Sequence, residues 1–278
     1  MPESRLEGAV GGLGAVWTSL VALGEELDDA EFDAATECPG WTVRDQFSHL
    51  IGTELLLAGT GAPPPLRAYG DHVCNGLGEL NERFVVARRA HRGPDVVAEL
   101  AGLVAARLAA LGELDAEADG ARSASLLELV PYVDYVSART VDAFVHEQDI
   151  RRAIGRPGGR GGDAERVTLD RLEASLPYVL GRRVAAPRGT TLRLDVEGEL
   201  GRTVQLVVAA DDAGAPEALA TSVIEGPPTA ALRMDEETFV RRACGRISAD
   251  AARASRCTEL FGDVGVASTF LECMVVTA

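Results

Sequence analysis

The feature that most constrains the fold of this chain is a change in hydrophobic period on either side of one glycine-rich segment. Residues 156–162 read RPGGRGG. Before this segment, apolar residues recur every three or four positions, which is typical of amphipathic helices; after residue 190 they alternate, which is typical of strands. The sequence therefore predicts an α+β chain of two domains, a helical bundle over 1–160 and a helix plus a small α+β domain over 161–278.

Several amphipathic helices are predicted before the break. Thr42 and Asp45 form a capping-box pattern, which indicates a helix start, and Pro131 marks the start of the last helix or a kink in it. Short connections between successive helices favour an antiparallel bundle. The predicted helices cover 5–30, 42–58, 73–89, 94–114 and a last one that ends at Ile154. Residues 112–124 are acidic and are expected to form a loop.

Beyond the break the pattern predicts a helix, a β-hairpin and further strands. Alternating apolar residues over 192–196 and 204–208 flank the turn GELG, which indicates a hairpin. Asp235 is a suitable N-cap for a following helix. The other predicted elements are a helix over 164–180, strands over 230–234 and 257–261, and helices over 236–244 and 264–275.

The charge of the chain excludes two classes of partner. With 43 acidic and 27 basic residues the formal net charge is −16, so the phosphates of nucleic acids and anionic membranes would be repelled. Every basic residue is an arginine, and the absence of lysine excludes Schiff-base chemistry.

The cysteines and the N-terminus indicate a cytoplasmic protein. The five cysteines are scattered, without a C-x-x-C pair, and their odd number favours reduced thiols. The N-terminus lacks a signal-peptide pattern, and no uninterrupted apolar run is expected to span a bilayer.

Two histidines and one aspartate are candidate metal ligands. Asp142 and His146 are one helical turn apart and therefore share a helix face, and His49 lies in a second predicted helix. If these helices pack together, the three side chains can hold a divalent ion and leave one coordination position open, as in catalytic sites. Asp45, one turn before His49, is placed to orient that imidazole. On spacing alone, a solvated ion pair between Asp142 and His146 is the alternative.

Two segments resemble a known family. Residues 36–50, TECPGWTVRDQFSHL, and 145–157, VHEQDIRRAIGRP, resemble two signatures of mycothiol-dependent maleylpyruvate isomerase-like proteins. The tail, through 232–239, Gly245-Arg246 and 261–263, resembles their sterol-carrier-like C-terminal domain. The resemblance implies a DinB-like four-helix bundle that holds a divalent metal, followed by a small α+β sterol-carrier-like domain.

The resemblance also implies roles for single residues. His49 and His146 match the metal-binding histidines of the family, and Asp142 stands one turn before His146, where the family usually has a glutamate ligand. An aspartate is one methylene shorter, so the metal must lie nearer the helix or be reached through water. Asp149 is implied to orient His146 or a bound thiol, and Arg246 to hold a substrate carboxylate.

The leading hypothesis is a metal-dependent isomerase or transferase, with zinc as the metal and mycothiol as the co-substrate. Its expected partners are a small thiol and a small electrophile that carries a carboxylate. Two alternatives stay open. One is a metal hydrolase that uses the same ligands without a thiol. The other is a non-enzymatic protein that binds a metal or a small apolar ligand.

Overall fold

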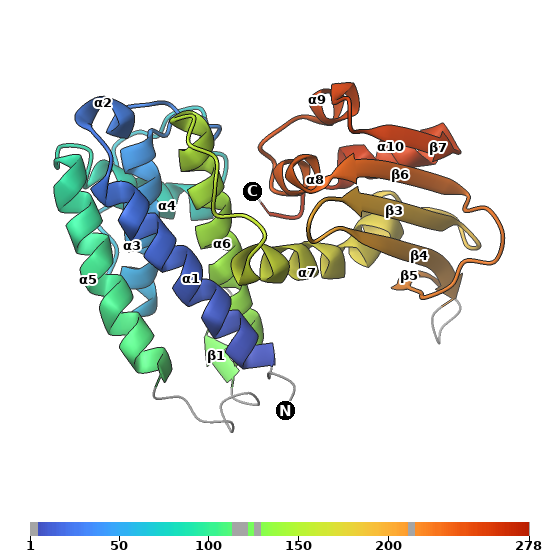
Figure 1. Cartoon of the computed structure of the whole chain (residues 1–278), viewed down its shortest axis with the longest axis horizontal. Coiled ribbons are helices and arrows are strands. Elements are labelled where there is room, and N and C mark those ends of the chain that lie inside the picture. Colours follow the sequence, from blue (N-terminus) through green and yellow to red (C-terminus); the bar gives the residue numbers. More distant parts are fainter. Residues whose placement is uncertain (1–4, 113–121, 125–128, 211–214, 278) are drawn as a thin grey trace. The chain divides into compact units, whose positions relative to one another are not determined.

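The computed structural model describes residues 5–112, 122–124, 129–210 and 215–277. Contacts divide the chain into two compact units, Met1–Thr168 and Leu169–Ala278 (Figure 1). The division falls inside helix α7, Asp163–Tyr178. The domain bounds at residues 160 and 161 stay a prediction. The first unit is helical and the second contains a mixed sheet, so the predicted α+β fold is confirmed.

Four long helices form a closed bundle in the first unit. Helix α1 packs against α5 and α6, and α3 packs against the same two helices, so each member has two neighbours. Large side chains such as Trp17, Phe47 and Phe144 fill the interior and are almost inaccessible to solvent. The bundle helices are α1 (Arg5–Glu25), α3 (Val43–Leu57), α5 (Gly93–Gly112) and α6 (Tyr132–Ala153), with α4 (Gly76–Val86) packed on α3 and the short α2 (Asp29–Phe32) beside it.

Local capping residues determine where these helices begin. The Thr42 hydroxyl accepts from the Asp45 backbone amide, while the Asp45 carboxylate accepts from the Thr42 amide, so the predicted capping box of α3 is confirmed. Asp28 and Glu31 form a second capping box at α2. This second box explains why the helix predicted to run to residue 30 ends at Glu25 and a new helix starts.

Helix α1 is apolar because it is a core helix. Among the described residues it is long and apolar enough to cross a membrane by length and composition, contrary to the expectation from the sequence. Nine of its residues are buried in the bundle, Trp17 and Leu20 among them, where α5 and α6 contact it.

The glycine-rich segment is attached to the bundle. Gln148 Nε2 donates to the carbonyl of Gly158 over 3.1 Å, and Arg156 pairs with Glu31 at 2.6 Å. Gly159 allows the backbone of this segment to lie close to Glu147 of α6, because a Cβ at this position would be only 2.6 Å from Glu147 Oε1. Side chains of α2 and α6 thus hold a segment whose composition is that of a free linker.

The second unit contains a five-stranded sheet of order β5-β4-β3-β6-β7. Strands β3 and β4 form the predicted antiparallel hairpin, with Leu194 opposite Val204, and β6 pairs with β3 in parallel. The strands are β3 (Thr191–Glu197), β4 (Arg202–Ala210), β5 (Pro216–Ala220), β6 (Ala230–Asp235) and β7 (Glu259–Gly262). Asp235 caps α8 as predicted, with its carboxylate accepting from the Thr238 amide.

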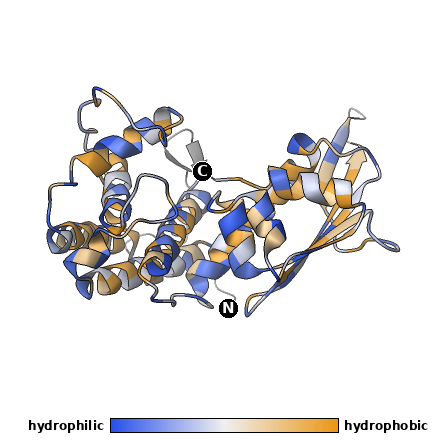
Figure 2. Cartoon of the chain, turned by 90° about the horizontal axis from the view of Figure 1, so that it is seen from above, coloured by the Kyte–Doolittle hydropathy of each residue, from blue (hydrophilic) through white to orange (hydrophobic). Residues whose placement is uncertain are grey.

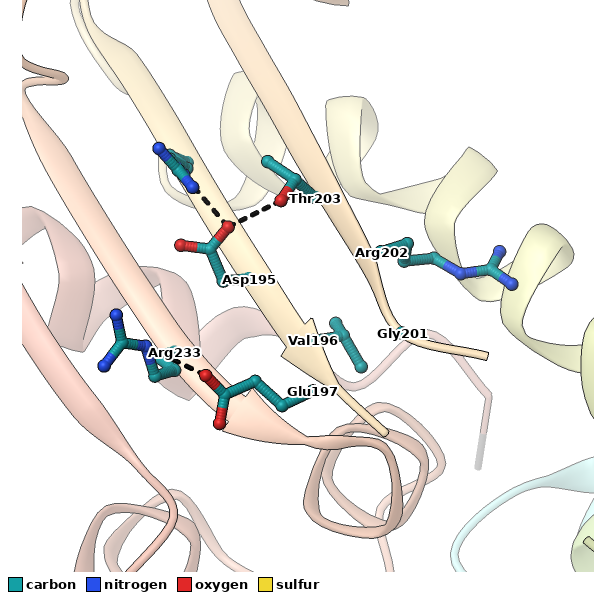
Figure 3. Close-up of a pocket in the computed structure, with 8 residues that line it drawn as sticks. Asp195, Val196, Glu197, Gly201, Arg202, Thr203 and Arg233 are labelled. Carbon is teal, nitrogen blue, oxygen red and sulfur yellow. Dashed lines mark hydrogen bonds and ion pairs between the residues drawn. The ribbon is translucent and has the colours of Figure 1, made fainter. Parts of the chain in front are cut away.

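The two faces of this sheet differ in character. Leu192, Leu194 and Leu206 point to a buried face, where a π-helical turn (Val179–Arg183), α8 (Glu236–Ala243) and α10 (Val264–Cys273) contact the strands. The other face is polar, and the Asp195 carboxylate there accepts from Thr203 and Arg193 in an open depression (Figure 3). Figure 2 shows that hydrophobic and hydrophilic residues are interspersed along the elements.

Strands β1 (Arg122–Ala124), β2 (Leu129–Pro131) and β5 and the short helix α9 (Ala249–Ala254) were not predicted from the sequence. Strands β1 and β2 form a short antiparallel ribbon, so the end of the predicted acidic loop is wrong, and residues 113–121 lie outside the described residues. Strand β5 carries the segment PEALA, whose Glu, Ala and Leu side chains favour helices; pairing with the edge of β4 overrides that preference.

Candidate metal centre

The bundle brings His49, Asp142 and His146 together. His49 lies on α3, the other two lie on α6, and these helices contact each other. Asp142 Oδ1 is 3.3 Å from His49 Nε2 and 3.4 Å from His146 Nε2. The imidazole rings meet edge to face, with centroids 4.6 Å apart. One atom of each side chain lies within 4.8 Å of both others.

This arrangement fits a tetrahedral metal. Zinc bonds of about 2.0–2.2 Å to nitrogen and oxygen place neighbouring ligand atoms about 3.3–3.6 Å apart on the edges of a tetrahedron. The two separations from Asp142 Oδ1, 3.3 and 3.4 Å, match such edges. The aspartate therefore reaches both histidines without the extra methylene of a glutamate, and three ligands leave a fourth corner open.

Burial favours the metal-binding form of His49. The residue is 6% exposed, and desolvation lowers its pKa, despite the opposing effect of Asp142. A neutral imidazole has the free nitrogen that a metal needs. The indole of Trp41 covers both histidines, with centroids 5.2 Å from His49 and 6.1 Å from His146.

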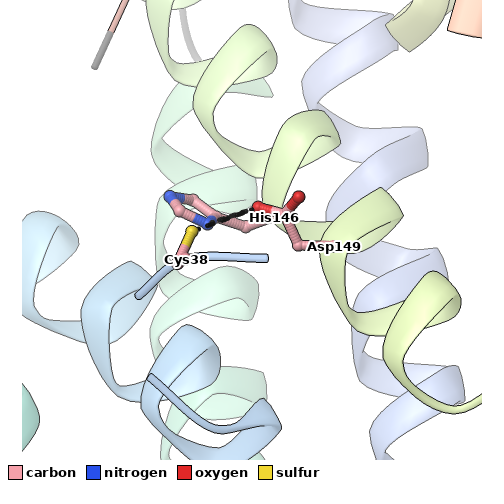
Figure 4. Close-up of side chains that lie close together, drawn as sticks. All are labelled: Cys38, His146 and Asp149. Atoms are coloured by element: carbon pink, nitrogen blue, oxygen red, sulfur yellow. Dashed lines mark hydrogen bonds and ion pairs between the residues drawn. The ribbon is translucent and has the colours of Figure 1, made fainter. Parts of the chain in front are cut away.

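Asp149 lies against the other nitrogen of His146. Its Oδ2 is 3.5 Å from His146 Nδ1, and its Oδ1 pairs with Arg152 at 2.5 Å. Cys38 Sγ donates to the same Oδ2 over 3.4 Å (Figure 4). Burial opposes the charged form of His146, but its contacts with Asp142, Asp149 and Cys38 outweigh burial and raise its pKa well above the usual value.

Arg139 holds the far oxygen of Asp142. Its Nη1 donates to Asp142 Oδ2 over 2.7 Å, and its Nε donates to Glu54 Oε1 over 2.9 Å. Glu54 also accepts from Arg107 at 3.1 Å. Burial raises the pKa of Asp142, but its interactions with His49, Arg139 and His146 outweigh that effect and hold it well below its usual range. Oδ1 thus faces the imidazoles as an ionised acceptor.

Sequence reasoning missed two contributors to this site. Arg139 stands three residues before Asp142 on the same helix face, a spacing that could have identified it. Cys38 stands in the first family-like segment, although a lone thiol before a Pro-Gly turn carries no signal of its own. Only the packing of that turn against α6 places it beside His146.

Asp45 has other partners than the one expected. Its Oδ2 accepts from the Thr42 amide over 3.0 Å, and its Oδ1 lies 3.3 Å from Arg89 Nε. Within the described ranges, its carboxylate thus serves the helix cap and Arg89 rather than the His49 ring. Arg89 also pairs with Glu82, which accepts from Trp41 Nε1 over 2.9 Å.

Arg246 belongs to the second unit and follows α8. Its backbone amide donates to Arg241 O over 2.8 Å, and Gly245 adopts a φ of +71°, a geometry typical of a helix C-terminus. Its Nη1 donates to the carbonyl of Cys244 over 2.8 Å. A role for Arg246 toward a substrate carboxylate stays a prediction.

Comparison with known proteins places the bundle in one family. The family model described as "Mycothiol maleylpyruvate isomerase N-terminal domain" matches residues 13–151, a segment that contains all three candidate ligands and Cys38. No curated protein matches the chain significantly in sequence.

Two solved structures share the fold. A crystal structure of the mycothiol-dependent maleylpyruvate isomerase has 18% sequence identity and a TM-score of 0.53, over 92% of this chain and 91% of the other. A histidine-to-alanine mutant of that enzyme gives 18% identity and a TM-score of 0.52, over 87% and 88%. The family model covers half of the chain, so this protein belongs to the family of the mycothiol maleylpyruvate isomerase N-terminal domain.

Proposed function

We propose that this protein is a metal- and mycothiol-dependent isomerase or transferase that acts on a small electrophile with a carboxylate. The observation that carries the proposal is the triad of His49, Asp142 and His146 inside a bundle of this family, in which Asp142 Oδ1 lies 3.3 and 3.4 Å from the Nε2 atoms of the two histidines. Zinc is the metal that suits two imidazoles and one carboxylate with an open corner. When bound there, it would lower the pKa of a coordinating thiol and so supply a nucleophile.

The residues around the triad support this use. Arg139 fixes the orientation of Asp142, so that one oxygen faces the histidines. Asp149 lies on the Nδ1 side of His146 and favours the tautomer whose Nε2 is free for the metal. Trp41 shields the histidine rings from water on one side, which strengthens electrostatic interactions in the site.

An isomerisation by a thiol needs no other reactant. The thiolate adds to one carbon of a double bond, the single bond that remains rotates, and the thiolate leaves again, so that atoms and electrons balance. A carboxylate on the substrate requires a fixed cation, and in this chain every basic residue is an arginine. Arg246 is the candidate, through paired hydrogen bonds to the carboxylate.

Metal content and turnover test the proposal. The purified chain should contain about one zinc ion, and the double variant His49→Gln/His146→Gln should contain none. His72→Gln is the matched control, because that histidine pairs with Glu82 outside the triad. Turnover of maleylpyruvate should require both zinc and mycothiol.

Two outcomes would overturn the proposal in different directions. Stoichiometric metal that survives the double variant would contradict the triad. If the double variant loses its metal, but turnover by the unmodified chain does not depend on mycothiol, a metal hydrolase is favoured.

A further inference from the structure

A second group of possible ligands lies on the opposite edge of the His146 ring from the triad. It consists of Cys38, Asp149 and the Nδ1 atom of His146, whose ligand atoms all lie within 4.8 Å of one another (Figure 4). Cys38 is held in a turn, because its amide donates to Thr36 Oγ1 and its carbonyl accepts from the Trp41 amide. The thiol is therefore placed before any ligand arrives.

The spacing in this group suits a thiophilic ion. Tetrahedral zinc, with bonds of about 2.3 Å to sulfur and about 2.0–2.2 Å to oxygen, separates these two atoms by about 3.5–3.7 Å. Cys38 Sγ lies 3.4 Å from Asp149 Oδ2, and that oxygen lies 3.5 Å from His146 Nδ1. Arg152 binds the other oxygen of Asp149, so Oδ2 faces the group.

An independent observation points to a ligand at this position. His146 is 6% exposed, and its Nδ1 atom lies 3.5 Å from Asp149 Oδ2 but makes no hydrogen bond of good geometry within the described part of the chain. A buried ring nitrogen without such a bond costs stability unless something binds it. A metal ion between Nδ1, the thiol and the carboxylate would satisfy that nitrogen.

We propose that Cys38, Asp149 and His146 Nδ1 form a second site for a thiophilic divalent ion, and that its occupation excludes a metal in the triad. The exclusion, though not the site itself, rests on the proposed function of the triad. Binding replaces the proton of the Cys38 thiol, which passes to solvent, by the metal ion.

Histidine tautomers explain the exclusion. A neutral imidazole has one nitrogen free for a metal and one that carries hydrogen. With the ion on Nε2, the Nδ1 hydrogen points to Asp149. With the ion on Nδ1, the Nε2 hydrogen can donate to Asp142 Oδ1, 3.4 Å away. A soft ion at Cys38 would thus withdraw His146 from the triad.

A cadmium titration tests the site in the full chain. Cys74 and Cys257 are exposed, so the titration uses the background Cys74→Ser/Cys257→Ser. We expect sulfur-to-cadmium charge-transfer absorption that saturates at one ion per chain. Cys38→Ser should abolish it, and Asp149→Asn should weaken cadmium binding at least about 10-fold.

Two further variants separate this site from the triad. His49→Gln and Asp142→Asn each remove a triad ligand and should retain the cadmium absorption, while Cys38→Ser should retain one zinc per chain. Circular dichroism shows which variants are folded. If the triad binds no metal at all, the cadmium absorption should still appear.

Absorption that survives Cys38→Ser would overturn the proposal. So would absorption that folded His49→Gln and folded Asp142→Asn both lose, because Cys38 would then be a fourth ligand of one common site.

Discussion

Replacing Arg139 by methionine should destabilise the bundle, because it breaks a buried ion pair. Arg139 is 7% exposed and Glu54 is 3% exposed, and the guanidinium donates to both Glu54 and Asp142. Removing one partner of a buried pair costs about 3–5 kcal/mol, since the remaining charge stays desolvated. Arg107 still pairs with Glu54, so we expect about 3 kcal/mol. Methionine occupies a similar volume and keeps the cavity contribution small.

Tryptophan fluorescence during urea unfolding measures this loss. The chain has two tryptophans, Trp17 and Trp41, and both lie in the first unit, so their emission reports on the bundle alone. Arg166→Met is the matched control. Arg166 pairs with Asp163 on the surface with its side chain 53% exposed, so its loss should cost no more than about 1 kcal/mol. Equal midpoints for the two variants would refute the reasoning about Arg139.

Three further predictions concern the site and its support. Asp142→Glu should keep or tighten zinc binding, because glutamate is the usual ligand in the family that the sequence resembles; competition with a chelator measures it, and affinity lower by a factor of ten would contradict it. Asp149→Asn should weaken zinc binding about 10–100-fold in the same assay, through His146, and unchanged affinity would show that Asp149 does not act there. Gly52→Ala should cost about 1–3 kcal/mol in urea unfolding, because its Cβ would lie 2.5 Å from Phe84; an unchanged midpoint would mean that α4 moves freely.

The local sequence was sufficient to predict most of the helices, the β3–β4 hairpin and the helix caps. Hydrophobic period and capping are interactions between residues a few positions apart, so Thr42 with Asp45, and Asp235 before α8, could be recognised without tertiary structure. The spacing of Asp142 and His146 on one helix face is local in the same sense. It identified two candidate ligands before any helix was placed.

Long-range packing decided what the sequence could not. Strand β5 exists because β4 offers it an edge, and the glycine-rich segment is held by α6 and α2 although its composition is that of a linker. Local interactions also changed the role of one residue. Asp45 was expected to orient the His49 ring, but its carboxylate accepts a hydrogen bond in the cap of its own helix.

The composition of the site is the clearest case. Arg139 and Cys38 flank the candidate ligands only because α3, α6 and the turn before α3 pack together. Separations between residues about 100 positions apart, such as His49 and Asp142, are set by the burial of the apolar faces of the helices. That burial free energy depends on how all the helices of the bundle pack together. The spacing of residues within a single helix therefore cannot predict it.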